Sequence, residues 1–208
     1  SGDEAFTLEG NVGPLDLTEV AALRGEYKPT MSGQVQASFD AGGTLGAPKL
    51  GLRGSLEKFR LGKVALGRAN LGWDYLAAKS VLTLAMVSSN GGQLRVKSEV
   101  GLDLSLSALK KGLDWAGAPV QASLASRGFD LAFLSGVHAT VRSVGGELTA
   151  DGNVDGKLGS PRFEGQLAWS RGRLGLAGVS EFRDIELKVA ADNSSVSIDK
   201  LEARSGAG

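Results

Sequence analysis

Apolar and polar residues alternate along much of this chain, and this alternation limits the folds that it can adopt. The longest alternating run extends from Leu94 to Leu106, and only Ser98 interrupts its apolar side. The apolar positions of the run are Leu94, Val96, Val100, Leu102, Leu104 and Leu106. Because successive side chains of a β-strand point to opposite faces, a period of two residues indicates a strand with one apolar and one polar face. We therefore predict one strand over residues 94–106, about twice the usual strand length.

The same alternation recurs in shorter segments on both sides of this run. The further apolar stripes are Val35, Ala37 and Phe39; Ala69, Leu71, Trp73 and Tyr75; Phe163, Leu167 and Trp169; Ile185, Leu187, Val189 and Ala191; and Val196 and Ile198. The apolar positions change parity after Ile198. This change predicts a β-bulge near Asp199 and Lys200. Turn-forming residues at 89–92, 145–146 and 192–194 separate the stripes and are typical of hairpins.

Helical signals are few and short. Asp16 is placed to cap a helix that begins at residue 17, and Asp130 is placed to cap one turn over residues 131–135. The segment 107–112 has the composition of a third short turn. Together the patterns predict an all-β fold: an elongated, curved antiparallel sheet with an open apolar groove and a few one- to two-turn helices.

An internal repeat organises the sequence. The segment that begins at Asp16 aligns with the segment that begins at Asp130, and the period is about 113 residues. The tetrapeptide LGAP at 45–48 matches LGSP at 158–161. Such repetition is typical of elongated architectures in which each unit packs on its neighbour. We predict a first unit over residues 1–119 and a second over 120–208, truncated at its C-terminal end, within one continuous domain.

The sequence lacks the residue clusters that catalysis or metal binding requires. The chain contains 31 glycines, one histidine and no cysteine, and its basic and acidic residues balance at 23 each. His138 has no second base or ligand near it in the sequence, and we interpret Asp151 and Asp155 as turn residues rather than a calcium loop. The glycine-rich stretch 42–54 has no P-loop signature and predicts hairpin turns. We expect no enzymatic activity, no cofactor, no metal site and no nucleic-acid partner.

The alternation by itself permits two architectures. In the first, the apolar faces of two sheets close over each other in a sandwich core. In the second, the apolar face of a single curved sheet stays open as a groove for lipid tails or unfolded chain. The low aromatic content, 6%, and the stripes of Leu, Val and Ala favour a smooth lining.

At the repeated motif the sequence resembles the TamB family of AsmA-like proteins, the inner-membrane component of the translocation and assembly module. The resemblance is carried by residues 129–208 and by a signature of the form G-x-L-x-x-P-x-(apolar)-x-G-x-(apolar). The signature positions are Gly156, Leu158, Pro161, Phe163, Gly165 and Leu167. A looser copy occupies residues 42–56 in the first repeat.

This resemblance implies a β-taco fold and a role in outer-membrane biogenesis. The parent protein would be anchored in the inner membrane of a Gram-negative bacterium, would cross the periplasm, and would work with a TamA-type outer-membrane barrel. We expect the groove to hold phospholipid acyl chains and to move phospholipids between the two membranes. The alternative that the resemblance implies is a chaperone for nascent outer-membrane proteins and autotransporters during protein secretion.

The residues expected to line the groove come from all the main stripes. They are Val35, Ala37, Phe39, Leu71, Trp73, Leu94, Val96, Val100, Leu102, Leu104, Leu106, Leu167, Trp169, Ile185, Leu187, Val189, Val196 and Ile198.

Overall fold

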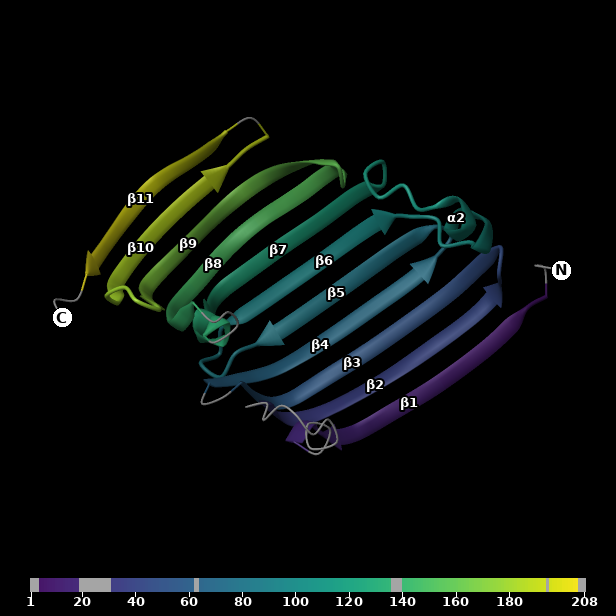
Figure 1. Cartoon of the computed structure of the whole chain (residues 1–208), viewed down its shortest axis with the longest axis horizontal. Helices are drawn as coiled ribbons and strands as arrows, with labels where there is room; N and C mark the ends of the chain where they lie inside the picture. The colour runs from purple at the N-terminus through teal and green to yellow at the C-terminus, as the bar shows by residue number, and fades with distance from the viewer. Residues whose placement is uncertain (1–3, 19–30, 62–63, 136–139, 194, 206–208) are drawn as a thin grey trace.

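Eleven strands in sequence order form one antiparallel sheet (Figure 1). The computed structural model describes residues 4–18, 31–61, 64–135, 140–193 and 195–205. The strands are β1 (Phe6–Asp16), β2 (Met31–Thr44), β3 (Ala47–Leu61), β4 (Val64–Leu76), β5 (Lys79–Val87), β6 (Gln93–Gly101), β7 (Pro119–Asp130), β8 (Val141–Lys157), β9 (Ser160–Leu176), β10 (Phe182–Ala191) and β11 (Val196–Ser205). Every strand pairs with its neighbours in sequence, so the described strands form a single meander with β1 and β11 at its edges.

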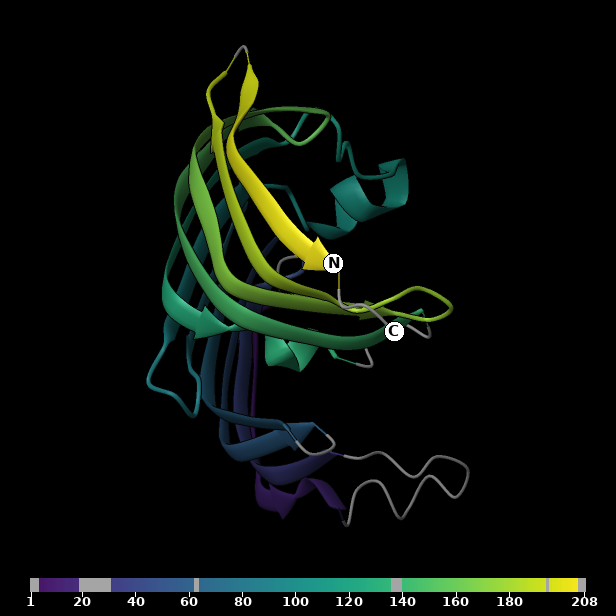
Figure 2. The ribbon, with the colours of Figure 1, turned by 90° about the vertical axis from the view of Figure 1, so that its left-hand side faces the viewer.

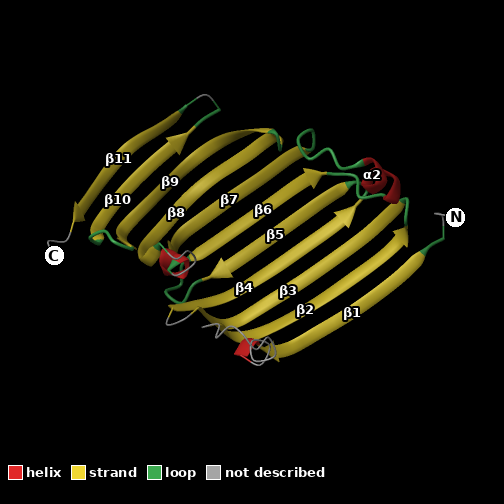
Figure 3. Ribbon diagram, viewed as in Figure 1, coloured by secondary structure: helices red, strands yellow, loops and turns green. Residues whose placement is uncertain are grey.

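The sheet is curved and does not close (Figure 2). Two short helical segments accompany it, α2 (Leu106–Lys111) and the 3-10 turn η1 (Leu131–Leu134), and strands dominate the rest (Figure 3). These observations confirm the prediction of an all-β fold built from one curved antiparallel sheet with little helix. Because all the described strands belong to one sheet, they form no second sheet that could seal the apolar face in a sandwich.

The strand register assigns the apolar stripes to the concave face. Tyr75 lies on the same face as Trp73 and Leu71, as the alternation predicted. Its hydroxyl oxygen accepts a hydrogen bond from the backbone N–H of Leu104, in the connection that leads into α2. Because α2 lies on the concave side of the sheet (Figure 2), the apolar face is the concave one.

The backbone irregularities of the sheet follow the sequence repeat. Gly33 and Gly146, 113 positions apart, both have positive φ angles, 137° and 106°, and each lies at a break in the strand register. Lys58 and Arg171, also 113 positions apart, share a φ of 52°. A Cβ atom at Gly33 would lie 2.8 Å from the Glu57 carbonyl oxygen, and one at Gly146 would lie 2.7 Å from that of Ser170. The repeat therefore extends to the conformation of the strands, while the division into units at residue 119 stays a prediction, since the sheet runs without a break through β6 and β7.

One strand prediction is wrong at its C-terminal end. Strand β6 ends at Gly101, so Leu102, Leu104 and Leu106 do not continue the ladder. The Asp103 carboxylate accepts the backbone N–H of Ser105, and the Ser105 hydroxyl caps α2 by accepting the N–H of Ala108. Such local side-chain bonds compete with strand pairing, and they turn the chain out of the sheet.

Two turn predictions are also wrong. Gly145–Gly146 lies inside β8, where it forms a bulge instead of a hairpin. Asp151 and Asp155 likewise lie within β8. The hairpin between β8 and β9 falls instead at residues 158–159, which match the 45–46 turn between β2 and β3.

Other local predictions are confirmed. Residues 88–92 form the β5–β6 turn, closed by a 2.8 Å bond from the Ser88 N–H to the Gly92 carbonyl. The register between β10 and β11 shifts at Asp199, where the parity change predicted a bulge. Asp130 caps η1 by accepting the N–H of Ala132. His138 lies outside the described residues. Of the helix expected after Asp16, the structure describes the first two positions, 17–18, and both are helical.

Candidate functional site

The concave face carries an apolar row that crosses the whole sheet. One residue from each of the eleven strands contributes, each directly opposite the next in the register. The row consists of Val12, Ala37, Gly54, Leu71, Leu84, Val96, Leu124, Gly152, Gly165, Ala191 and Val196. It contains no polar side chain, so an apolar path runs from one edge of the sheet to the other.

A second row of the same kind lies beside the first. Its members are Leu15, Val35, Leu56, Ala69, Met86, Leu94, Ser126, Ala150, Leu167, Val189 and Ile198. The one polar member, Ser126, donates its hydroxyl to the Leu148 carbonyl over 2.8 Å. Two rows of eleven residues therefore present a surface of aliphatic side chains, which is the chemistry that apolar ligands bind.

The predicted groove residues fall mostly on this face. Nine of them, Val35, Ala37, Leu71, Leu94, Val96, Leu167, Val189, Val196 and Ile198, belong to the two rows. Phe39 and Trp73 share the next row, and Val100 lies opposite Val120 in the row beyond it. Leu187 pairs with both Trp169 and Leu201, and Ile185 is buried opposite Gly172. Leu102, Leu104 and Leu106 are the exceptions, because they belong to the β6–β7 connection.

Several residues of the two rows were not predicted from the sequence. Leu84 and Met86 lie in segment 82–86, whose alternation of apolar residues is itself typical of a strand. Leu56 and Leu124 are harder to find because their neighbours on the same face include glycine, alanine and serine. A face built from small residues gives a weak periodic signal even where the sheet is continuous.

Burial differs widely between positions of the concave face and is low on the edge strand β11. Tyr75 is 2% exposed, whereas Val196 and Ile198 on the edge strand β11 are 71% and 63% exposed. The two tryptophans of the concave face have their indole N–H groups bonded within the protein: that of Trp73 donates to the Ser80 hydroxyl at 2.8 Å and that of Trp169 to the Gly145 carbonyl at 3.0 Å. These bonds leave the rings available to present carbon surface on the concave side.

The convex face is polar and carries cross-strand ion pairs. Arg53 and Asp74 approach to 2.6 Å, Lys79 and Glu99 to 2.7 Å, and Arg162 pairs with Asp155. All of these side chains are partly or largely exposed, so each pair stabilises the fold only slightly.

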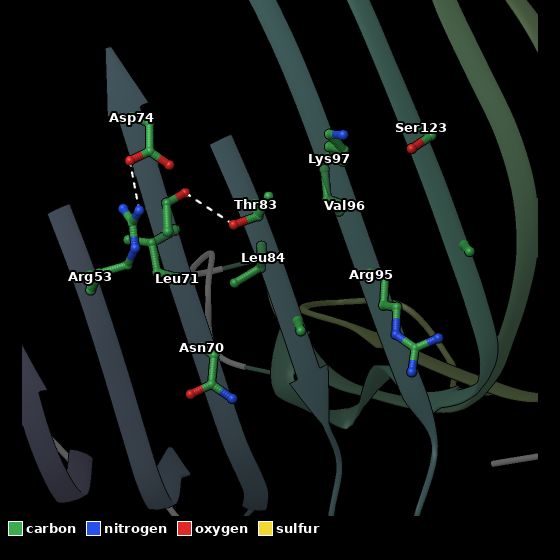
Figure 4. A pocket seen from close by; sticks show the side chains of 13 residues that line it. Arg53, Asn70, Leu71, Asp74, Thr83, Leu84, Arg95, Val96, Lys97 and Ser123 are labelled. Atoms are coloured by element: carbon green, nitrogen blue, oxygen red, sulfur yellow. Dashed lines mark hydrogen bonds and ion pairs between the residues drawn. The ribbon is translucent and has the colours of Figure 1, made fainter. Parts of the chain in front are cut away.

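A shallow hollow of about 600 Å³ lies over β3 to β7, and its lining combines residues of the polar face with Leu71, Leu84 and Val96 of the first row. Its lining includes Arg53, Arg95, Lys97 and Ser123 (Figure 4). The Arg53 guanidinium also donates to the Leu52 and Trp73 carbonyls, so it is held within the sheet surface. Arg53 is therefore held at the sheet surface by its ion pair with Asp74 and by these two carbonyls.

Ionisable groups with altered pKa values lie outside the apolar rows. A hydrogen bond and the charge of Glu147 raise the pKa of the Arg171 guanidinium. Hydrogen bonds from the hydroxyl and the backbone N–H of Thr18 lower the pKa of Asp16. The charge of Glu186 also contributes to the raised pKa of Arg171. Within the described part of the chain no group of three or more His, Cys, Asp or Glu is placed to hold a metal ion.

Comparisons with known proteins do not place this chain in a family. Protein-family models, curated proteins and solved structures gave no match. Among the helices that the structure describes, none has the length and hydropathy to span a bilayer.

Proposed function

We propose that this chain is a lipid-conduit segment whose concave face carries phospholipid acyl chains between the inner and outer membranes of a Gram-negative cell envelope. It would belong to a TamB-like protein that is anchored in the inner membrane and crosses the periplasm. The observation that carries the proposal is the pair of apolar rows that cross all eleven strands without a charged residue.

The two faces of the sheet differ as a conduit requires. Acyl chains gain about 0.8 kcal/mol for each methylene removed from water, so a continuous apolar face holds them without directional bonds. Gly54 in the first row leaves room for a ligand above the backbone, since a Cβ atom there would come no nearer than 3.8 Å to the side chains and backbone around it. The polar convex face keeps the outside of the sheet in contact with water.

Photo-crosslinking from the middle of the face tests the proposal. A photoreactive residue at Leu124 or Val96 lies on the concave side, and one at the neighbouring Ser123 or Lys97 lies on the convex side. We expect lipid adducts from the first pair and none from the second. Adducts to nascent outer-membrane proteins instead of lipid would favour the chaperone role, and adducts from neither pair would contradict both.

A charge on the concave face provides a functional test. Val96→Asp and Leu187→Asp place a carboxylate in the path of the acyl chains, and lipid transfer between donor and acceptor vesicles should fall at least about tenfold because burying an unpaired charge is costly. Lys97→Asp is the matched control on the opposite face. Undiminished transfer by a folded Val96→Asp protein would contradict the conduit.

A further inference from the structure

Exposed apolar side chains gather along one rim of the sheet, where the hairpin turns meet the connection between β6 and β7. We call it the α2 rim and define it by six large apolar side chains that are all exposed: Leu45, Leu76, Leu106, Leu109, Trp115 and Leu158. Trp115 and Leu109 are 57% and 51% exposed. At the described turns of the opposite rim, Val179 is the one large apolar side chain in this exposed group.

Backbone hydrogen bonds fasten the connection 102–118 to three separate turns. The Leu106 N–H donates to the Leu45 carbonyl in the β2–β3 turn, and the Leu102 N–H donates to the Ala78 carbonyl in the β4–β5 turn, both over 2.9 Å. At the β8–β9 turn, the Gly159 N–H donates to the Ala116 carbonyl over 3.0 Å. These bonds hold the backbone of the connection against the three turns, so the residues of the α2 rim lie on connected segments.

The connection itself is amphipathic. Leu106 and Leu109 are three residues apart in α2 and so lie on one side of the helix, and α2 buries none of its residues. Lys110 and Lys111 occupy its last turn. Lys49 and Lys157 are exposed close to the β2–β3 and β8–β9 turns. The connection has two acidic residues, Asp103 and Asp114, and the carboxylate of each accepts a backbone N–H group of its own turn.

We propose that the α2 rim docks onto the surface of a lipid bilayer that contains anionic lipids. Leucine and tryptophan side chains enter the boundary between headgroups and acyl chains, and lysines beside them meet the lipid phosphates. The anchors stand at turns separated by up to six strand spacings, roughly 30 Å along the sheet, which suits a broad planar surface. The rim runs parallel to the two apolar rows, so the docked sheet would lie along the membrane surface. The proposal is therefore independent of a conduit that crosses the periplasm, and the rim residues lie outside the rows.

Vesicle co-sedimentation tests the proposal with the full chain. We expect binding to vesicles of phosphatidylcholine with phosphatidylglycerol, and at least about tenfold weaker binding by the variant Leu109→Ser with Trp115→Ser. Both side chains are more than half exposed, so the fold should survive, which circular dichroism checks. Val179→Ser, an exposed residue of the opposite rim, is the matched control and should bind as the wild type does. Lys110→Ser with Lys111→Ser should weaken binding to the anionic vesicles only.

The fluorescence of Trp115 provides an independent measurement of membrane contact. Brominated lipids should quench the fluorescence of the wild type more strongly than that of Trp115→Phe, which keeps Trp73 and Trp169 on the concave face, and the difference between the two proteins reports the contact of Trp115 with lipid. The concave variant Val96→Asp should bind vesicles normally, which separates failure of the conduit from failure of the docking site. Three results would overturn the proposal. The first is that the wild type binds no vesicles, and the second is that Val179→Ser loses as much vesicle binding as the double variant. The third result is a dimer that does not bind vesicles and that Leu109→Ser with Trp115→Ser dissociates.

Discussion

The backbone N–H of Leu104 donates a 2.7 Å hydrogen bond to the hydroxyl oxygen of Tyr75. This bond joins the β6–β7 connection to the concave face at a side chain that is 2% exposed. Tyr75→Phe keeps the ring and leaves the Leu104 N–H without its acceptor, so the free energy of unfolding should fall by about 1–2 kcal/mol. Urea denaturation measures the loss, and amide exchange at Leu104 should speed up more than exchange at the β6 amide of Val96. Unchanged protection at Leu104 would contradict the role given to the hydroxyl.

In the same region, the residue pattern does not predict where strand β6 ends. The alternation of Leu94, Val96 and Val100 is a strand signal, and the sheet contains that strand. Leu102 and Leu104 continue the alternation, yet the chain leaves the sheet at Gly101. Two kinds of hydrogen bond hold the chain outside the sheet. The bond between Asp103 and Ser105 joins residues close in sequence, whereas the Leu102 N–H donates to the carbonyl of Ala78, far away in sequence. A two-residue period reports neither kind of contact.

The apolar face was predictable as a set of stripes and not as two continuous rows. Stripes rich in large residues, such as 35–39 and 69–75, identified their own faces correctly. The rows also need Gly54, Gly152 and Gly165, which the sequence marks only as turn or bend residues. Pairing across strands assigns these glycines to the apolar face, and pairing depends on turn positions and bulges that short-range patterns define poorly.

Gly33 and Gly146 should not tolerate a side chain. Both have positive φ angles, and a Cβ atom would lie within 2.8 Å of a backbone carbonyl oxygen at either position. Gly33→Ala and Gly146→Ala should each lower the free energy of unfolding by about 2 kcal/mol or more. Gly91→Ala is the matched control, because Gly91 has a φ of 86° and open space around its Cβ position. Equal losses at Gly91 and Gly146 in thermal denaturation would show that the close carbonyl contributes nothing.

Phe129 should be the most sensitive apolar side chain of the sheet. It is 0% exposed and stands opposite Leu148, immediately before Asp130 caps η1. Phe129→Ala should cost about 3–5 kcal/mol, as cavities in close-packed sites do. Phe163→Ala is the matched control on the same face, since Phe163 is 54% exposed and should lose less than about 1 kcal/mol. Chemical denaturation of the two variants measures the difference, and similar losses would show that the sheet has no packed region under η1.

Asp16 should titrate below the ordinary range of an aspartate. The Thr18 hydroxyl and backbone N–H both donate to its carboxylate, and these bonds lower its pKa. Because the folded pKa is depressed, the bonds are fully present above the ordinary pKa and are lost as the pH falls through the folded value. Thr18→Val removes the hydroxyl, which is the larger cause, so the Asp16 pKa should rise toward its ordinary value. Carboxyl-carbon NMR titration of both proteins measures the shift, and an unchanged Asp16 pKa in Thr18→Val would assign the depression to the backbone N–H alone.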